Sequence, residues 1–237
     1  MYIELKTSSA FSFLEGASLP EEIAREAARL EYPAIALLDR DGLYGAPRFY
    51  KACLKAGVRP LVGARISLKE GVELSLLVED QKGYQNLCQL LTQMKLNTTK
   101  GCGKINLDTL ESYSTKGLVC LTSNLQGPLS TKISRDGFRK SSRILDRLKM
   151  IFGPKSVFVE IQRHFLREQE RLNQILVDLS DRNNVPLLAS NGVLYAHQKR
   201  RPLQDILTCI RHKKTLRKAG RLLSINSERY LKPPAEM

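Results

Sequence analysis

Short apolar segments that end in small or polar loops recur along the chain and alternate with amphipathic helical patterns. Four of these segments run into the loops Glu4–Ser18, Leu37–Gly45, Val62–Arg65 and Ala189–Tyr195, where Asp, Asn, Ser or Gly follows the apolar run. This alternation is typical of an α/β protein with a mainly parallel sheet. In such proteins the functional sites are built where strands end. We therefore expect one pocket lined by these four loops.

The apolar periodicity also predicts the position of each element. Strands are expected at residues 2–5, 34–38, 61–68, 73–78, 118–122, 156–161 and 185–189. Helices are expected at residues 19–31, 46–56, 83–96, 138–152, 166–182 and 203–211. Ser18 is expected to cap the first helix. In the last helix the apolar stripe is expected to face inward, and its residues are Leu203, Ile206, Leu207 and Ile210. Residues 97–104 and 123–136 are expected to be loops.

Basic residues outnumber acidic ones by a wide margin, with 38 Lys and Arg against 24 Asp and Glu and a net charge of +14. Such an excess is the electrostatic footprint of a polyanion binder. We expect weak, sequence-independent contact with DNA, or docking to another subunit, through helix 138–152 and segment 197–237. The residues expected to carry this contact are Arg139, Lys140, Arg143, Arg147, Lys199, Arg200, Arg201, Lys213 and Lys214.

Length and cysteine usage limit the class of protein. The 237 residues suffice for one large α/β domain, and we expect residues 1–196 to form it and residues 197–237 to be a basic C-terminal segment. The five cysteines, at positions 53, 88, 102, 120 and 209, form no CxxC pair, which favours reduced, mostly buried thiols in a cytoplasmic protein. No apolar run approaches the roughly 18 residues of a membrane span, so no membrane partner is expected.

Six blocks of the sequence, taken in order, resemble the PHP (polymerase and histidinol phosphatase) domain of bacterial DNA polymerase III alpha subunits, and within that group the error-prone polymerases. The blocks are ELKTSSAFSFLEGAS at 4–18, ALLDRDGLYGAPRFYKACLKAGVRPLVGA at 36–64, GYQNLCQLL at 83–91, VEIQRH at 159–164, PLLASNGVLY at 186–195 and LQDILTCIR…ERYLKPPAEM at 203–237. The resemblance implies a distorted seven-stranded β/α barrel, related to the TIM barrel, and a place in DNA replication or repair. It also implies that segment 197–237 leads toward a polymerase palm, whose metal-binding carboxylates have no candidate here.

The resemblance further places the metal ligands of the family on this sequence, and most of the ligand types are replaced. The corresponding positions are Lys6 and Ser8 for His-x-His, Glu15 for an acid, Asp39-Arg40-Asp41 for Asp-His-Asp, Arg65 for a Glu, Lys95 for a His, and Gly192-Val193-Leu194 for Asp-x-His. Only Glu15, Asp39 and Asp41 keep an acidic side chain.

Three of these positions, Lys6, Arg40 and Arg65, now carry cations. Lys and Arg offer hydrogen-bond donors only, and they place positive charge where a metal would sit. We expect them to pair with the remaining acids, or alternatively to hold a phosphate of nucleic acid. No cofactor is expected beyond, at most, one Mg²⁺ or Mn²⁺ on Glu15, Asp39 and Asp41.

Glu160 and His164 complete the predicted pocket because they follow the expected strand 156–161. A lone His in this position favours a hydrogen-bonded structural role over a catalytic one. Other catalytic signatures are missing, since there is no P-loop and no GxGxxG. Ser8, Ser9 and Ser12 have no His near them in the sequence, so a triad cannot be argued.

Three functions stay open at this point. The first is a non-catalytic PHP module of a polymerase, with a structural or docking role. The second is an active metal-dependent phosphoesterase, such as a 3′–5′ exonuclease, which the replaced ligands disfavour. The third is a stand-alone basic nucleic-acid-binding protein. Whether the chain is an enzyme is therefore left open, and no catalytic residue is assigned.

Overall fold

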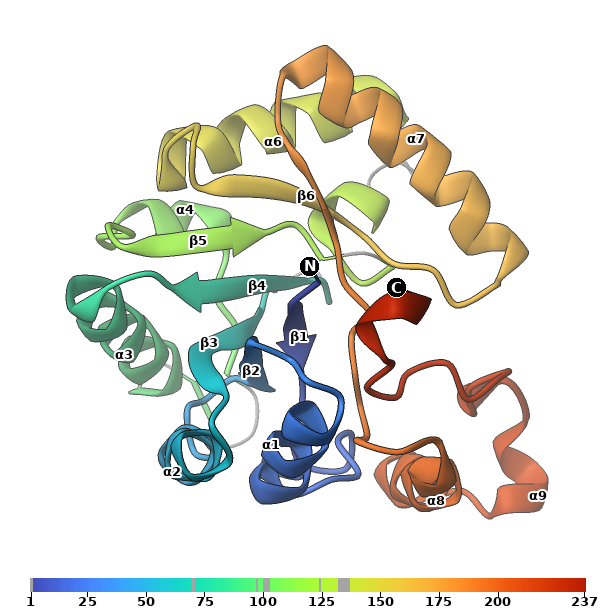
Figure 1. Cartoon of the computed structure of the whole chain (residues 1–237). Coiled ribbons are helices and arrows are strands. Elements are labelled where there is room, and N and C mark those ends of the chain that lie inside the picture. The colour runs from blue at the N-terminus through green and yellow to red at the C-terminus, as the bar shows by residue number, and fades with distance from the viewer. Residues whose placement is uncertain (1, 70, 97, 100–102, 124, 132–136) are drawn as a thin grey trace. The chain divides into compact units, whose positions relative to one another are not determined.

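A computed structural model of the chain describes residues 2–69, 71–96, 98–99, 103–123, 125–131 and 137–237 (Figure 1). The chain divides into two compact units. Unit 1 comprises Met1–Val62 and Asn191–Met237, and unit 2 comprises Gly63–Ser190. Unit 1 is thus assembled from two distant stretches of sequence, and the predicted basic segment 197–237 belongs to it.

Unit 1 holds two parallel strands with helices packed on them. Glu4 of the first strand lies opposite Ile35 of the second, and Val193 adds an isolated parallel bridge to Thr7. The elements of unit 1 are β1 (Glu4–Thr7), α1 (Pro20–Arg29), β2 (Ala34–Arg40), α2 (Ala46–Ala56), the first residues of β3 (Arg59–Ser67), α8 (Arg201–Arg211), α9 (Leu216–Ala219) and short 3-10 helices at Gln198–Arg200, Gly220–Leu222 and Pro234–Glu236.

One apolar core holds the two stretches of unit 1 together. Ile23 of α1 and Phe49 of α2 are completely buried, as is Ile35 of β2. Val193 and Leu231, from the second stretch, belong to the same cluster. Burial of large apolar side chains contributes about 1.5–3 kcal/mol each, so the C-terminal stretch is held by packing and not only by surface contacts.

Unit 2 continues the alternation of strands and helices. Its strands pair in chain order, antiparallel from β3 to β4 and from β4 to β5, then parallel from β5 to β6 and from β6 to β7. Helices α6 and α7 pack together over β6 (Figure 1). The elements of unit 2 after β3 are β4 (Glu73–Val78), α3 (Gln81–Leu96), α4 (Leu107–Glu111), β5 (Leu118–Leu121), α6 (Phe138–Phe152), β6 (Val157–Ile161), α7 (Arg167–Asn183) and β7 (Leu187–Ala189).

Some expectations for single elements are wrong. The N-cap of α1 is Leu19 and not Ser18, because the Ser18 hydroxyl accepts the backbone N–H of Ala196 at 2.9 Å. The helix α4 was not expected, and residues 128–131 are helical within the predicted loop 123–136. Residues 124 and 132–136 of that loop lie outside the described residues, as do 97 and 100–102 of the other predicted loop.

The prediction of which face of α8 points inward is also wrong. Leu207 alone of the four packs toward the cluster that contains Leu194 and Tyr195. Gln204 and Thr208 are buried instead, and the Gln204 amide donates to the Thr208 hydroxyl at 2.9 Å. The remaining apolar residues point to solvent, with exposures of 37%, 45% and 56% for Leu203, Ile206 and Ile210. We call these three residues the α8 stripe.

The described cysteines are all free, and Cys53, Cys120 and Cys209 are buried. Burial raises the pKa of Cys53 to about 12 and also raises the pKa of Cys120, since a thiolate is poorly solvated inside a core. Cys102 lies outside the described residues. Among the described helices, none combines the length and the hydrophobicity that a membrane crossing requires.

Candidate functional site

The carboxylate of Asp39 lies at the end of β2 and is surrounded by hydrogen-bond donors. It is 1% exposed. Its Oδ1 accepts the backbone N–H of Ser9 at 2.8 Å and the hydroxyl of Ser12 at 2.7 Å, and its Oδ2 accepts the hydroxyl of Ser9 at 2.8 Å. A Cβ on Gly45 would lie 2.5 Å from Oδ2, so the carboxylate also packs against a position that has no side chain. The loop after β1 and the start of α2 are therefore organised around Asp39.

Glu15 carries the second acidic group of this loop, and two arginines share it. Its Oε1 accepts from Nη1 of Arg40 and, at 2.8 Å, from Nη1 of Arg211 in α8. The backbone N–H of Arg40 in turn donates to the Ser12 hydroxyl at 3.0 Å, which links this ion pair to Asp39. We call Ser9, Ser12, Glu15, Asp39, Arg40 and Arg211 the strand-end network.

Glu4, at the start of β1, is a third buried acid of unit 1, and it was not among the predicted site residues. It is completely buried. Its carboxylate accepts the backbone N–H of Lys6 at 2.9 Å, the hydroxyl of Tyr2 at 2.7 Å and the backbone N–H of Asn191 at 2.8 Å. The last bond joins the first strand to the loop that precedes Gly192. An acid at the start of an apolar strand was the signal available in the sequence.

Backbone hydrogen bonds connect most of the remaining predicted positions of unit 1. The N–H of Val193 donates to Lys6 O and the N–H of Ser8 donates to Val193 O, both at 2.9 Å. Lys6 and Ser8 are buried, as is Leu194. Gly192 accepts from Nε of Arg229 at 3.0 Å. The structure therefore brings the loops after β1, after β2 and at 190–196 together, while Asp41 follows β2 with a left-handed φ of 53°.

Arg65 belongs to unit 2 and pairs within its own hairpin. It lies on β3, and its Nη1 is 3.0 Å from Oε2 of Glu73 on β4. Its side chain is 5% exposed. Arg65 on β3 therefore pairs with an acid on the neighbouring antiparallel strand β4, a pairing that was not predicted.

Glu160 and His164 lie at the end of β6. The Glu160 carboxylate is completely buried and accepts from the Gln162 amide at 2.6 Å and from the Ser190 hydroxyl at 2.5 Å. The backbone N–H of His164 donates to Oε1 of Gln169 at 2.6 Å, so the amide nitrogen of Gln169 faces Nδ1 of the ring at 3.2 Å. A buried ring held this way is tied to the start of α7, and its Nδ1 acts as an acceptor.

The predicted basic surface is partly neutralised by acids of the chain. Arg147 of α6 contacts both Asp108 and Glu111 of α4, which lowers the pKa of Glu111. In the C-terminal stretch, Arg200 pairs with Glu22 and Arg201 lies 3.6 Å from Asp205. Arg139, Lys140 and Arg143 of α6, and Lys199, Lys213 and Lys214 of the C-terminal stretch, are exposed.

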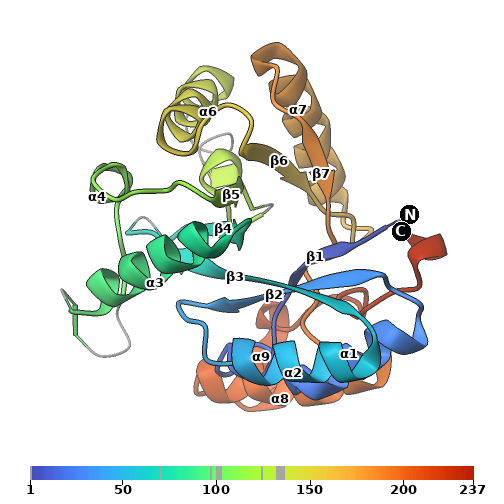
Figure 2. The same ribbon diagram turned by 60° about the vertical axis from the view of Figure 1, so that its left-hand side comes forward.

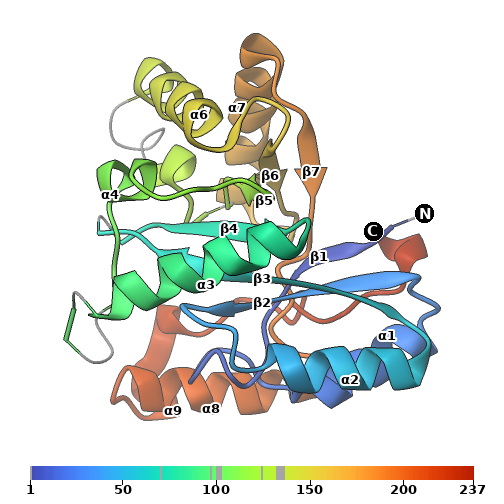
Figure 3. The ribbon, with the colours of Figure 1, turned by 90° about the vertical axis from the view of Figure 1, so that its left-hand side faces the viewer.

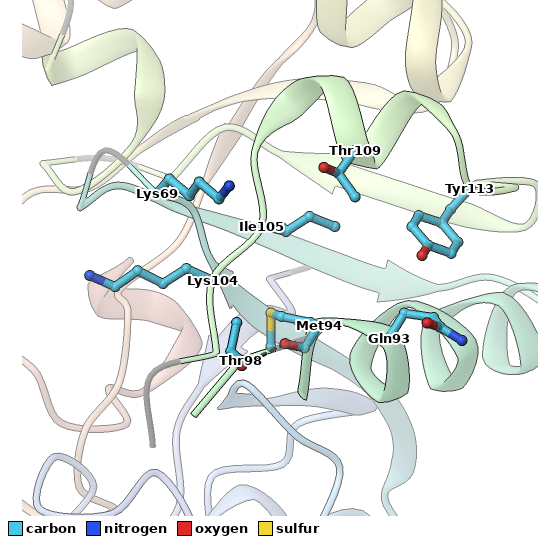
Figure 4. A pocket seen from close by; sticks show the side chains of 8 residues that line it. All are labelled: Lys69, Gln93, Met94, Thr98, Lys104, Ile105, Thr109 and Tyr113. Atoms are coloured by element: carbon cyan, nitrogen blue, oxygen red, sulfur yellow. Dashed lines mark hydrogen bonds between the residues drawn. The ribbon is translucent and has the colours of Figure 1, made fainter. Parts of the chain in front are cut away.

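The cavities of the structure involve few of the predicted residues, although Lys199 and Arg200 of the predicted basic surface line a cavity of about 630 Å³ in unit 1. One cavity of about 150 Å³ in unit 2 is lined by Lys69, Gln93, Met94, Thr98, Lys104, Ile105, Thr109 and Tyr113 (Figure 4). None of the predicted site residues lines it. Among the described residues, no three His, Cys, Asp or Glu side chains are grouped so that they could hold a metal ion.

Buried acids lie at the ends of β2 and β6, on a scaffold in which strands and helices alternate. The model of the PHP domain family matches residues 4–164. The chain belongs to the PHP domain family, since the match covers well over half of its length.

The whole chain is similar to one part of larger bacterial DNA polymerases. It is 33% identical over 236 residues to error-prone DNA polymerase 1 of Agrobacterium fabrum, covering 100% of this chain and 20% of that protein. It is 35% identical over 247 residues to error-prone DNA polymerase of Mycolicibacterium paratuberculosis (100% and 23%) and 29% identical over 250 residues to DNA polymerase III subunit alpha of Treponema pallidum (100% and 21%). The chain spans about a fifth of the length of these curated relatives.

Solved structures support the fold. An amidohydrolase from Chromobacterium violaceum superposes with a TM-score of 0.58 at 16% identity, covering 82% of this chain and 88% of that one. A two-domain protein containing a predicted PHP-like metal-dependent phosphoesterase, from Bacteroides vulgatus, gives a TM-score of 0.50 at 12% identity, covering 81% and 52%. These likenesses concern the fold alone, and they confirm the predicted α/β class with a PHP-like seven-stranded sheet.

Proposed function

We propose that the chain is a non-catalytic PHP module of a DNA polymerase, with a degenerate metal site and a docking role toward the polymerase body in DNA replication or repair. The similarity to error-prone DNA polymerases and to DNA polymerase III subunit alpha supports the polymerase context. The chain matches about a fifth of the length of these relatives, and the role proposed is that of one module within such a polymerase.

The chemistry of the strand-end network does not fit a multi-metal site. Metal ions bind through lone pairs of carboxylates and neutral imidazoles. Here the lone pairs of Asp39 face the donors of Ser9 and Ser12, and Glu15 Oε1 is shared by Arg40 and Arg211. A cation at this place would have to displace guanidinium groups of the same charge sign, which costs electrostatic energy in a poorly solvated site. This argues against the phosphoesterase alternative.

The α8 stripe is the observation that carries the docking role. Leu203, Ile206 and Ile210 follow helical spacing along α8, the helix that lies beside α9 in Figure 3. All three are exposed, while polar Gln204 and Thr208 are buried. A helix that presents its apolar face to solvent loses the burial that normally stabilises it. Exposed apolar faces of this kind mark contact surfaces. The occupant we propose is the polymerase portion of the relatives that lies outside the segment matched by this chain.

A binding measurement tests the proposal. The titrant is the error-prone DNA polymerase of Mycolicibacterium paratuberculosis from which the segment matched by this chain has been removed. The unchanged chain is expected to bind it, and Ile206→Asp with Ile210→Asp is expected to weaken binding at least about tenfold, because two buried apolar contacts are worth more than about 1.4 kcal/mol together.

The matched control changes two other exposed apolar helix residues, Leu96→Asp and Met150→Asp, which are 72% and 77% exposed. These changes should leave the affinity unaltered. Equal losses in both variants, or no binding of the unchanged chain, would contradict the docking role. Circular dichroism of each variant separates a lost contact from a lost fold.

A further inference from the structure

A cationic groove lies between α1 and α2, on the surface of unit 1. The two helices pack side by side (Figure 2), and the groove has a volume of about 510 Å³. Its lining residues are Glu21, Arg25, Arg48, Lys51, Ala52, Lys55 and Ala56. We call this set the α1–α2 groove. It contains four cations and one acid, and none of its residues was predicted as a site.

The single acid of the groove pairs with one of the cations. Arg48 donates two hydrogen bonds to the Glu21 carboxylate, from Nε at 2.6 Å and from Nη2 at 3.0 Å. This pairing is the first cause of the lowered pKa of Glu21, so the acid stays ionised and keeps Arg48 in place. The guanidinium also lies 5.6 Å from the centre of the Phe11 ring. Three of its five N–H donors remain for another anion.

The other three cations of the groove are not held in a close ion pair, although the charge of Arg25 acts on Glu21 and contributes to the lowered pKa of that acid. Within the described part of the chain, no salt bridge involves Arg25, Lys51 or Lys55, and all three side chains are exposed. Lys51 and Lys55 lie one helical turn apart, an arrangement in which like charges destabilise a helix. An anion from outside the chain would relieve this repulsion.

The cations form a row with a defined pitch. Arg48, Lys51 and Lys55 follow the spacing of one helix face, and a rise of 1.5 Å per residue places them along about 10 Å of the axis of α2. Arg25 lies across the groove on α1. Each strand of DNA presents one phosphate per about 3.4 Å of helix axis, so three phosphates fall within the same length.

From this arrangement we infer that the α1–α2 groove binds the phosphodiester backbone of a nucleic acid. The lining of the groove supports this occupant over an acidic protein segment. Its apolar members are Ala52 and Ala56, and none of the described residues that line it is an aromatic or large aliphatic anchor of the kind that interfaces between proteins require. Phosphate contacts need only positioned cations. The inference rests on the charges of unit 1 and not on the proposed docking of a polymerase body.

Fluorescence anisotropy with a labelled DNA duplex of mixed sequence tests the inference. With three to four phosphate contacts, the affinity of the whole chain should fall about 40- to 150-fold between about 50 and 200 mM salt, since each contact adds about 0.9 to the logarithmic slope. Lys51→Glu with Lys55→Glu should lower the affinity at least about tenfold at the lower salt and reduce the slope by about two.

The matched control reverses the same charge on the predicted basic helix, through Arg139→Glu and Arg143→Glu, two exposed residues of α6. This variant should keep the slope of the unchanged chain. If it loses the binding while the groove variant keeps it, the site lies on α6 and the inference is overturned. Absence of binding at the lower salt overturns it as well. Lys51→Gln with Lys55→Gln, which only neutralises the charges, should give an intermediate loss.

A poly-glutamate peptide with the same number of charges as the DNA separates the two kinds of partner. Displacement of the DNA only at a large excess of peptide is expected, and it supports a nucleic-acid site. Displacement by an equal concentration would show that the groove takes any extended polyanion, and would overturn the assignment in favour of an acidic protein segment.

Discussion

The strand-end network and the α1–α2 groove belong to the same unit, but they differ in where their charged groups find partners. In the network, the buried carboxylates of Asp39 and Glu15 receive donors from the chain itself. In the groove, Lys51 and Lys55 are exposed cations for which no salt bridge is found within the described residues. Desolvation explains the difference, because an unpaired charge is costly only where water is excluded.

The strand-end network satisfies its charged groups within the chain, whereas the α1–α2 groove exposes cations that can meet an outside ligand. A network whose donors and acceptors match internally rigidifies a fold and has little left for a ligand. A surface row of like charges does not stabilise the fold, and its cations are available to an outside partner. Family resemblance alone would point to the strand-end network as the functional region. The excess of exposed positive charge points instead to the α1–α2 groove.

Removing the central acid of the network should have the largest effect. Asp39→Ala leaves the Ser9 N–H and the Ser9 and Ser12 hydroxyls without their acceptor. We expect a loss of about 3–5 kcal/mol in the free energy of unfolding, because each orphaned buried donor costs about 1–3 kcal/mol. Urea unfolding measures it. Asp39→Asn keeps the shape and one acceptor oxygen and should lose clearly less, and an equal loss in both would mean that packing rather than hydrogen bonding holds the loop.

Crowding the same carboxylate should have an intermediate effect. In Gly45→Ala the new Cβ would lie 2.5 Å from Oδ2 of Asp39 and 3.1 Å from Oγ of Ser9. We expect a loss of about 1–3 kcal/mol, as for other overpacked sites. A double-mutant cycle with Asp39→Ala sharpens the test. The cost of Gly45→Ala should shrink once the carboxylate is gone, and an unchanged cost would place the clash elsewhere.

Added ions should produce the smallest shifts, and the two regions should respond to opposite signs of charge. Mn²⁺ or Zn²⁺ should not raise the melting temperature, because the network has its own cations. A metal bound at 100 times its Kd would add about 2.7 kcal/mol, which a thermal melt would reveal. Tripolyphosphate, in a separate sample, should raise the melting temperature slightly. Lys51→Gln with Lys55→Gln should abolish this rise, and a rise that persists would place the anion outside the groove.

Local sequence patterns predicted most of the helices and strands, but they predicted less well which parts of the chain these elements contact. Helices 46–56 and 138–152 and strand 73–78 have the expected bounds, because each has a long periodic apolar pattern. The five-residue helix α4 was missed because it is too short to show a period. The outward face of α8 was mispredicted because periodicity shows that a helix has an apolar face but not which way the fold turns it.

The site residues were placed by family resemblance, and their contacts depend on distant segments. Pairing of Glu15 with Arg40 was among the expectations, whereas Arg211, which shares the same carboxylate, is 196 residues away and gave no local signal. Ser18 looked like a helix cap because Ser, Pro and acids follow the usual order, yet its hydroxyl is used by Ala196. Such long-range competition is invisible in any short window of sequence.

Because unit 1 is assembled from two distant stretches of the sequence, its two parts are synthesised at different times. The Tyr32 hydroxyl donates to Lys232 O at 2.8 Å, the N–H of Ala17 donates to Leu194 O at 2.7 Å, and Leu231 completes the core that surrounds Ile35. Residues 1–62 therefore lack partners that are synthesised more than a hundred residues later, whereas every residue of unit 2 is synthesised before those partners. Non-local closure of this kind slows folding, and the half-made core of unit 1 is the part of the nascent chain that chaperones would have to shield.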